Sequence, residues 1–498
     1  MKFIVMSKQL ICMLVAGIFT ASPVYAENLR EAVQYMIETN PDVRSAVYGR
    51  LARDEEVRQA RAGYYPTFDA EAGAGQSWYD RDYRQEEVID PKKKVPEGED
   101  PEMHWVGKSE SDDLTPLEAR LSLRQNLFAG MSTWNEVDRQ EARVRSGAYT
   151  IQATSEDTAL KTVSVYLEVL RRQELVTLSE KNLAVHQRIT KKVSLRSNAG
   201  VGSTADLDQI ETRLNLAESD VVVSKLNLNE SEINYLALVG RSPADLIKPS
   251  VSDSLLPDSM EDAEQQAVAY RPALKAATAD LESRRKARDI ADSPFMPTID
   301  LDAEQSWEEE SSAVDESRDE FKIMVKLRYN FFNGFKDHAR KAEATHLISE
   351  AREIRNNTHR KVVESVQLSW RSYLAAKSRL PYLTDRVKYA KATAESYNKQ
   401  WGIGKRTLLD VLNTEAEAIS AIKERLNTEY DLLYNQYRVL NGMGQLVNGL
   451  GAEYPQESRV EESQIEQNDK AKNSDITIHE TLIQPSFHGS NPTIAMGI

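Results

Sequence analysis

The sequence is nearly free of cysteine and has no hydrophobic run long enough to cross a membrane as a helix. Its single cysteine, Cys12, falls in the apolar run 10–19, between a basic start and the small-residue sequence Val24-Tyr25-Ala26. This order is typical of a secretory signal peptide over residues 1–26, and the run is too short for a transmembrane helix. We therefore expect an exported chain without disulfides, transmembrane helices or a lipid-anchor cysteine.

Motifs for catalysis and metal binding are missing as well. The sequence contains no GxSxG, HExxH, GxxxxGK[ST] or CxxC pattern, and its seven histidines are scattered without metal-ligand spacing. The formal net charge of −15 at pH 7 argues against a nucleic-acid partner. We expect no enzyme, no cofactor and no metal site.

Glycine and proline are nearly absent from two long stretches. Residues 131–198 contain only Gly147, and residues 335–400 contain only Pro381, so each stretch predicts a helix of roughly 100 Å. The segments that follow carry apolar residues at strict intervals of seven, which indicates left-handed supercoiled packing. These residues are Leu207, Leu214, Val221, Leu228 and Tyr235, and then Leu412, Ile419, Leu426, Leu433 and Leu440.

The chain is an internal duplication. The segment LRQNLFAG at 123–130 returns as LRYNFFNG at 327–334, and PTFD at 66–69 returns as PTID at 297–300. The two offsets differ, which places an insertion in the first copy. We predict a first repeat over 27–240, a proline-rich connector over 241–270 and a second repeat over 271–447. The polar sequence from 452 to 498 predicts a disordered tail.

Each repeat contains alternating segments that predict a β-hairpin, over about 66–128 and about 297–332. Residues 117–124 and 321–331 alternate between apolar and polar, as a strand with two different faces does. The upstream strands carry acids and the downstream strands bases, which favours pairing within each hairpin. The insert at about 80–113 is read as a solvated surface loop. Helical hairpins are predicted over 131–240 and 335–447.

Strands of about ten alternating residues are long enough to cross a bilayer when tilted. Four strands cannot close a barrel, so the chain has to share one with copies of itself: two copies would give eight strands, and three would give twelve with a lumen. The polar faces would then line the lumen, through Glu118, Arg120, Arg124, Lys322, Lys326 and Arg328.

The repeat, the hairpins ending in Asn-x-Phe-x-Gly and the two turns AGVGSTADL (199–207) and GIGKRTLLDVL (402–412) resemble those of the TolC family of outer-membrane efflux and secretion ducts. The resemblance implies an α+β membrane protein that forms a homotrimer, with a twelve-stranded barrel in outer-membrane lipid continued by an α-helical periplasmic tunnel. It also implies two partners, a periplasmic adaptor and an inner-membrane transporter of the ABC type.

The resemblance assigns roles to residues at the two turns. Adaptor docking would involve Gly200, Val201, Gly202, Ser203, Gly402, Ile403, Gly404 and Lys405. A periplasmic gate would involve Asp206, Arg406, Trp401, Asp410 and Asn413. This sequence departs from the family pattern, because Trp401 replaces a tyrosine, Ala205 a threonine and Asn413 a second acid. An Arg406–Asp206 contact, within or between protomers, is the predicted latch.

Three functions remain open from the sequence. The first is a passive exit duct for type I protein secretion, including ducts that export large adhesins, which the second turn motif and the missing lipid-anchor cysteine favour. The second is a duct for multidrug or small-molecule efflux. The third, more distant, is a structural coiled-coil protein of the envelope that transports nothing.

Overall fold

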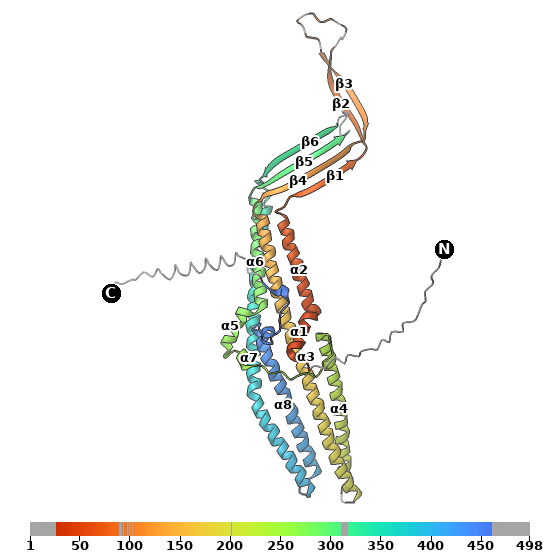
Figure 1. Cartoon of the computed structure of the whole chain (residues 1–498), viewed down its shortest axis with the longest axis vertical. Coiled ribbons are helices and arrows are strands. Elements are labelled where there is room, and N and C mark those ends of the chain that lie inside the picture. The colour runs from red at the N-terminus through yellow and green to blue at the C-terminus, as the bar shows by residue number, and fades with distance from the viewer. Residues whose placement is uncertain are drawn as a thin grey trace, which may run out of the picture.

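Two helices of 67 residues each run from the base of the strands to the opposite end of the molecule (Figure 1). The computed structural model describes residues 26–88, 92, 94–96, 98, 100–101, 103–200, 202–309 and 317–460; the predicted signal peptide lies outside them, apart from Ala26. The long helices are α3 (Ser132–Asn198) and α7 (Lys336–Gly402), and they turn back into α4 (Thr204–Val239) and α8 (Leu408–Gly442). Within the described residues, no helix has both the length and the hydrophobicity needed to cross a membrane.

Shorter helices complete the wall. Helices α2 (Pro41–Ala62) and α6 (Pro272–Ala291) lie beside the strand-proximal halves of α3 and α7, while α1 (Leu29–Thr39) and α5 (Met260–Tyr270) lie near the middle (Figure 1). Pro41 and Pro272 both occupy the first turn of their helices, where proline lacks only an N–H that would be unbonded anyway. The remaining short elements are η1 (Asp253–Leu255), η2 (Ser293–Phe295), α9 (Leu446–Gly449) and η3 (Gln456–Ser458).

Four antiparallel strands form one sheet in the order β1-β4-β5-β6. They are β1 (Thr67–Ala74), β4 (Leu117–Ala129), β5 (Thr298–Glu309) and β6 (Arg318–Arg328). Thr67 pairs with Arg124 in the first hairpin, and Thr298 pairs with Arg328 in the second. These pairs are equivalent under the two repeat offsets, so both hairpins have the same register. Strands β4 and β5 join the repeats, and β1 and β6 are the edges.

The insert does not form the predicted surface loop. Strands β2 (Ser77–Val88) and β3 (Met103–Leu114) pair antiparallel along their whole length as a two-stranded ribbon beyond the main sheet (Figure 1). Glu87 and Lys108 form an ion pair of 2.5 Å across it. The loop prediction was wrong because a strand was predicted only where apolar and polar residues alternate. Strands β2 and β3 lack an apolar face and are held together by backbone pairing.

The main apolar core lies near the middle of the molecule, where α1, α3, α4, α7 and α8 meet. Its fully buried side chains include Met36, Tyr166, Tyr235, Leu440 and Met443. The chain continues from this core into a segment that was predicted to be disordered from residue 452. That prediction is wrong for 452–460, because Ala452 and Ser458 are buried and Gln152 donates a hydrogen bond to the Ser458 carbonyl. Residues 461–498 lie outside the described part.

Candidate channel wall and periplasmic tip

The main sheet has one apolar and one polar face. On one face of β6, the apolar side chains are all more than 60% exposed: Phe321, Ile323, Val325 and Leu327. No described part of the chain covers this face, although apolar surface of this kind is normally removed from water. The alternate side chains of the same strand are predominantly charged. This arrangement suits a sheet with lipid on one side and water on the other.

Ion pairs cover the polar face and partly agree with the predicted pairing. Lys326 lies 2.7 Å from Asp302, within the second hairpin as predicted. Arg124 lies 3.0 Å from the same carboxylate, and Arg120 lies 3.6 Å from Glu304, so both bases of β4 bond to the other hairpin. The acids of β5 therefore connect the two repeats.

The remaining three predicted lumen residues lie on the same strands. Lys322 is 3.5 Å from Glu320. Glu118 is paired in register with Gly73 and with Glu308. Arg328 has no ion pair within the described chain. That all six residues face a lumen stays a prediction.

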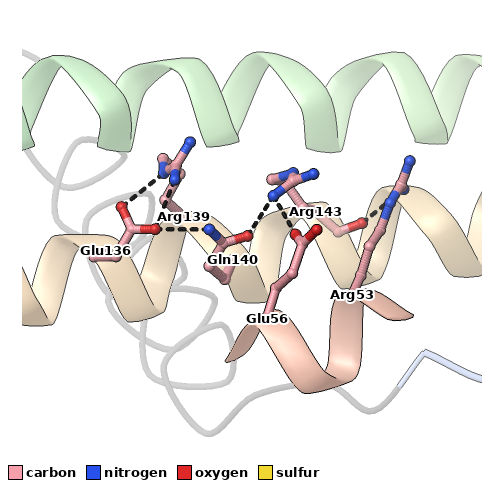
Figure 2. A network of polar contacts seen from close by, with 6 residues as sticks. All are labelled: Arg53, Glu56, Glu136, Arg139, Gln140 and Arg143. Atoms are coloured by element: carbon pink, nitrogen blue, oxygen red, sulfur yellow. Dashed lines mark hydrogen bonds and ion pairs between the residues drawn. The ribbon is translucent and has the colours of Figure 1, made fainter. Parts of the chain in front are cut away.

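A polar network joins α2 to α3 below the sheet. Glu136 accepts hydrogen bonds from Arg139 at 2.9 Å and from Gln140 at 2.6 Å. Burial opposes the ionisation of Glu136, yet these hydrogen bonds hold its pKa below the usual range. Figure 2 shows the whole chain of contacts, which consists of Arg53, Glu56, Glu136, Arg139, Gln140 and Arg143. Charge-assisted hydrogen bonds thus supplement apolar packing in this part of the wall.

Two tight turns form the end of the molecule opposite the strands (Figure 1). Gly200 and Gly404 are repeat equivalents, and both have a left-handed backbone, with φ of 73° and 77°, which glycine adopts without strain. A Cβ at Gly202 would lie 2.9 Å from the backbone nitrogen of Ser197. Ser203 caps α4 by accepting from the N–H of Ala205. The sequence therefore specifies both turns.

The other predicted docking residues lie in the same turns. Ile403 is an exposed apolar side chain, and Gly402 and Lys405 are exposed next to it. Val201 lies outside the described residues. The docking role of this set is untested and stays a prediction.

Trp401 connects the two helical hairpins at the tip. Its side chain is only 6% exposed and packs in a small core with Ile189, Val193, Ile210, Val411 and Leu412. The guanidinium of Arg196, on α3, lies 4.7 Å from the centre of the Trp401 ring and donates to the Gly402 carbonyl at 3.2 Å. Arg196 of α3 therefore holds the end of α7 by two contacts, one with the Trp401 ring and one with the Gly402 carbonyl.

Arg406 does not form the predicted latch within the chain. Its guanidinium lies 4.2 Å from the centre of the Tyr397 ring, and its Nε donates to Gln400 Oε1 at 3.2 Å. No ion pair joins Arg406 to Asp206 in the described residues, because Arg406 is held by its own helical hairpin. A contact between protomers stays a prediction.

Asp410 is engaged at the start of α8, and Asn413 is exposed one turn further along the helix. Asp410 and Thr407 form a capping box, with hydrogen bonds of 3.2 Å in both directions. The hydrogen bonds from the Thr407 side chain and backbone lower the pKa of Asp410. The carboxylate therefore stabilises the second tip turn.

Sequence reasoning missed both Arg196 and the buried carboxylate of Glu156. Glu156 is fully buried and accepts hydrogen bonds from the backbone N–H groups of Leu446 and Val447, at 3.1 and 3.0 Å, and from the Tyr454 hydroxyl at 2.6 Å. Burial raises its pKa, and these donors oppose that shift. The residue fastens the chain after α8 to α3. Its repeat equivalent is Arg360, so the duplication gave no signal for it.

Long helical hairpins below a sheet with one apolar and one polar face define an outer-membrane channel protein. The chain belongs to the family described as outer membrane efflux protein, whose model matches residues 32–241 and 263–445. This is the family that includes TolC. It confirms the resemblance drawn from the duplicated hairpins and the two turns.

The similarity covers most of the chain. The outer membrane efflux protein BepC of Brucella suis is 22% identical over 431 residues, covering 86% of this chain and 88% of that protein. The outer membrane protein TolC of Vibrio cholerae is 23% identical over 437 residues, covering 86% and 92%. A crystal structure of CusC superposes with a TM-score of 0.69 at 14% identity, covering 86% of this chain and 93% of that one.

These comparisons place the protein in the outer membrane, with its long helices on the periplasmic side. The family consists of passive channel proteins. Its members generally work as homotrimers with adaptors and inner-membrane transporters.

Proposed function

We propose that three copies of this chain form an exit duct in the outer membrane. The duct conducts substrates passively from an inner-membrane transporter and a periplasmic adaptor to the exterior. The observation that carries this proposal is the open sheet β1-β4-β5-β6, whose two edges have no partner strand within the described chain.

The open edges cannot stay unpaired in a bilayer, because hydrocarbon offers no hydrogen bonds to their backbone groups. Closure with copies of the same chain is the direct solution. Three copies give a barrel of twelve strands, wide enough for a lumen. The main strands, of 8 to 13 residues, suit a tilted crossing of the hydrocarbon layer. The long helices then continue the wall as a tunnel.

The opposite end of the duct is proposed to dock the adaptor and to contain the gate. Docking uses the exposed turns around Gly200 and Gly404. The gate comprises Trp401 with the predicted residues Asp206, Arg406, Asp410 and Asn413, and Arg196 joins this set through its contact with Trp401. Opening would separate the second helical hairpin from the first.

Type I protein secretion is the proposed process, with an ABC-type transporter as the energy source. The turn sequence at 402–412 favours this branch. Small-molecule efflux is the second candidate, favoured by the description of the family. A deletion strain separates the two: loss of one exported protein from the medium, with unchanged antibiotic sensitivity, supports secretion. Antibiotic sensitivity with normal protein export supports efflux and contradicts secretion.

The assembly itself is tested by the mass of the purified protein in mild detergent, measured by native mass spectrometry. We expect complexes of three chains. Monomers or dimers alone would contradict the proposed duct.

A further inference from the structure

The contact between the two repeats of one chain is a template for the contact between two chains. Strands β4 and β5 meet in a register that places Arg124 opposite Asp302 and Asn126 opposite Asp300. Both pairs are bonded: Arg124 Nε lies 3.0 Å from Asp302 Oδ1, and Asn126 Nδ2 donates to Asp300 Oδ1 at 2.7 Å. The first repeat therefore pairs its basic strand β4 with the acidic strand β5 of the second repeat.

The same chemistry recurs at the two open edges. The offset that takes β4 to β6 turns Arg124 into Arg328 and Asn126 into Asn330. The offset that takes β5 back to β1 turns Asp302 into Glu71 and Asp300 into Asp69. The base, the amide donor and the two carboxylates are thus all kept at the edges.

Three of these four edge side chains have no polar partner among the described residues, and the fourth is only partly engaged. In the described residues, no hydrogen bond or ion pair joins the side chains of Arg328, Glu71 or Asp69 to another group. The Asn330 side chain accepts from the Phe332 N–H through its oxygen, which leaves the amide N–H groups to donate elsewhere. The four groups are therefore available to a second copy.

Equivalent residues of β4 and of the β6 end differ in exposure, as expected if the edge strand β6 lacks a neighbouring strand. Phe128 is half-buried beside β5, whereas its equivalent Phe332 is 70% exposed. A Cβ at Gly130 would lie 2.6 Å from the Ser293 carbonyl, but one at Gly334 would meet nothing within 4 Å. The second repeat fills the space beside Gly130, whereas the equivalent space beside Gly334 is open.

We propose that β6 of one copy pairs antiparallel with β1 of the next, in the register of β4 and β5. Arg328 then forms an ion pair with Glu71 of the next copy, and Asn330 donates to Asp69 of the next copy. This inference rests on the proposed trimer and goes beyond it, because it fixes which residues meet at each of the three joints. The identical registers of the two hairpins support the transfer.

One competing register has to be distinguished. A shift by one residue would bring the apolar face of one strand to the polar side of the other. A shift by two residues keeps the faces and places Arg328 opposite Asp69, so charge alone does not exclude it. On the apolar face, the proposed register places Leu327 opposite Ala72, and the shifted register places it opposite Ala70.

Paired cysteines separate the two registers. The only native cysteine is Cys12, which lies in the predicted signal peptide. If the purified protein retains this segment, Cys12→Ser is included in every cysteine variant. Residues directly opposite in an antiparallel pair have Cα atoms about 4.5–5.5 Å apart, which a disulfide spans, whereas a shift of two residues exceeds its reach. We expect Leu327→Cys with Ala72→Cys to give covalent trimers after mild oxidation, and the matched control Leu327→Cys with Ala70→Cys to give almost none.

Native mass spectrometry of the reduced samples provides the separate readout of assembly. Preferential linkage of the 327/70 pair would overturn the register, as would trimers that link with neither pair; in both cases the proposed duct stands. A parent protein that forms no trimers would contradict both proposals.

A charge exchange tests the ion pair without cysteines. Arg328→Glu is expected to lower the trimer yield at least several-fold, and Arg328→Glu combined with Glu71→Arg to restore most of it. A double variant that assembles no better than Arg328→Glu alone would overturn the Arg328–Glu71 pair.

Discussion

Replacing Arg196 by methionine is expected to open the periplasmic tip. The methionine keeps much of the apolar length of arginine but removes the charge over the Trp401 ring and the hydrogen bond to the Gly402 carbonyl. A cation over an aromatic ring contributes about 0.5–1 kcal/mol at an exposed site. A hydrogen bond contributes about 0.5–1.5 kcal/mol. The variant therefore loses about 1–2.5 kcal/mol per protomer.

That loss has a measurable size. Since about 1.4 kcal/mol corresponds to a factor of ten, the opening equilibrium of each protomer's tip should shift by roughly 5- to 60-fold. The readout is the open probability of single channels in planar bilayers. The matched control is Lys192→Met, which removes a charge from the same helix one turn away, at a side chain without a polar contact in the described residues. The control should conduct like the parent.

The open probability of Arg406→Met, compared with that of Arg196→Met, shows which of the two arginines keeps the tip closed. In the described residues, the ring contact and the hydrogen bond of Arg406 are both with its own hairpin, at Tyr397 and Gln400. Without a contact between protomers, its loss should therefore change the open probability less than the loss of Arg196. An Arg196→Met channel that matches the parent would refute the assignment of Arg196 to the gate. A larger effect of Arg406→Met would restore the predicted latch between protomers.

Three further outcomes are expected. Val325→Arg places a charge on the lipid face and should destabilise the assembled barrel by about 2–4 kcal/mol near the midplane, seen as a lower melting temperature of the trimer; an unchanged melting temperature would contradict the assigned face. Glu156→Ala removes the acceptor of the Leu446 and Val447 N–H groups and of the Tyr454 hydroxyl, and leaving such a donor unpaired costs about 1–3 kcal/mol. The melting temperature should therefore fall by far more than in the exposed control Glu180→Ala, and equal falls would contradict the role of Glu156 in fastening the segment after α8 to α3. The pKa of Asp410 is lowered in the folded protein, so the Asp410 carboxylate stabilises the tip fully above the ordinary carboxyl pKa of about 3.9 and loses this effect as the pH falls below that value. The open probability of the parent should therefore rise at low pH, and that of Asp410→Asn should rise less. An identical pH dependence of the two channels would contradict the role of Asp410.

Periodicity and duplication predicted most of the fold, because both are local or repeated features. The scarcity of glycine and proline predicted α3 and α7, and strict alternation predicted β4 and β6. The ribbon β2–β3 was missed because its strands lack an apolar face. Residues 452–460 were wrongly predicted to be disordered, because they are structured by packing on α2 and α3, and this packing surface exists only in the folded chain.

The site was less predictable, because its contacts depend on how separate elements are placed. The turns around Gly200 and Gly404 could be read from the sequence, since glycine marks left-handed positions. The position of Arg196 over Trp401 depends on the angle between two helical hairpins, which no local pattern encodes. Likewise, the bonding of Arg124 to Asp302 depends on the repeats lying side by side in one sheet.

Single-channel conductance of the purified trimer in a planar bilayer tests the central claim most directly. If three open sheets close around a water-filled lumen that the helices continue, the parent should show discrete openings, and Arg196→Met should show them for a larger fraction of the time. Correctly folded trimers that insert into the bilayer and pass no current, even with the tip residue replaced, would contradict the duct and favour a structural role in the envelope.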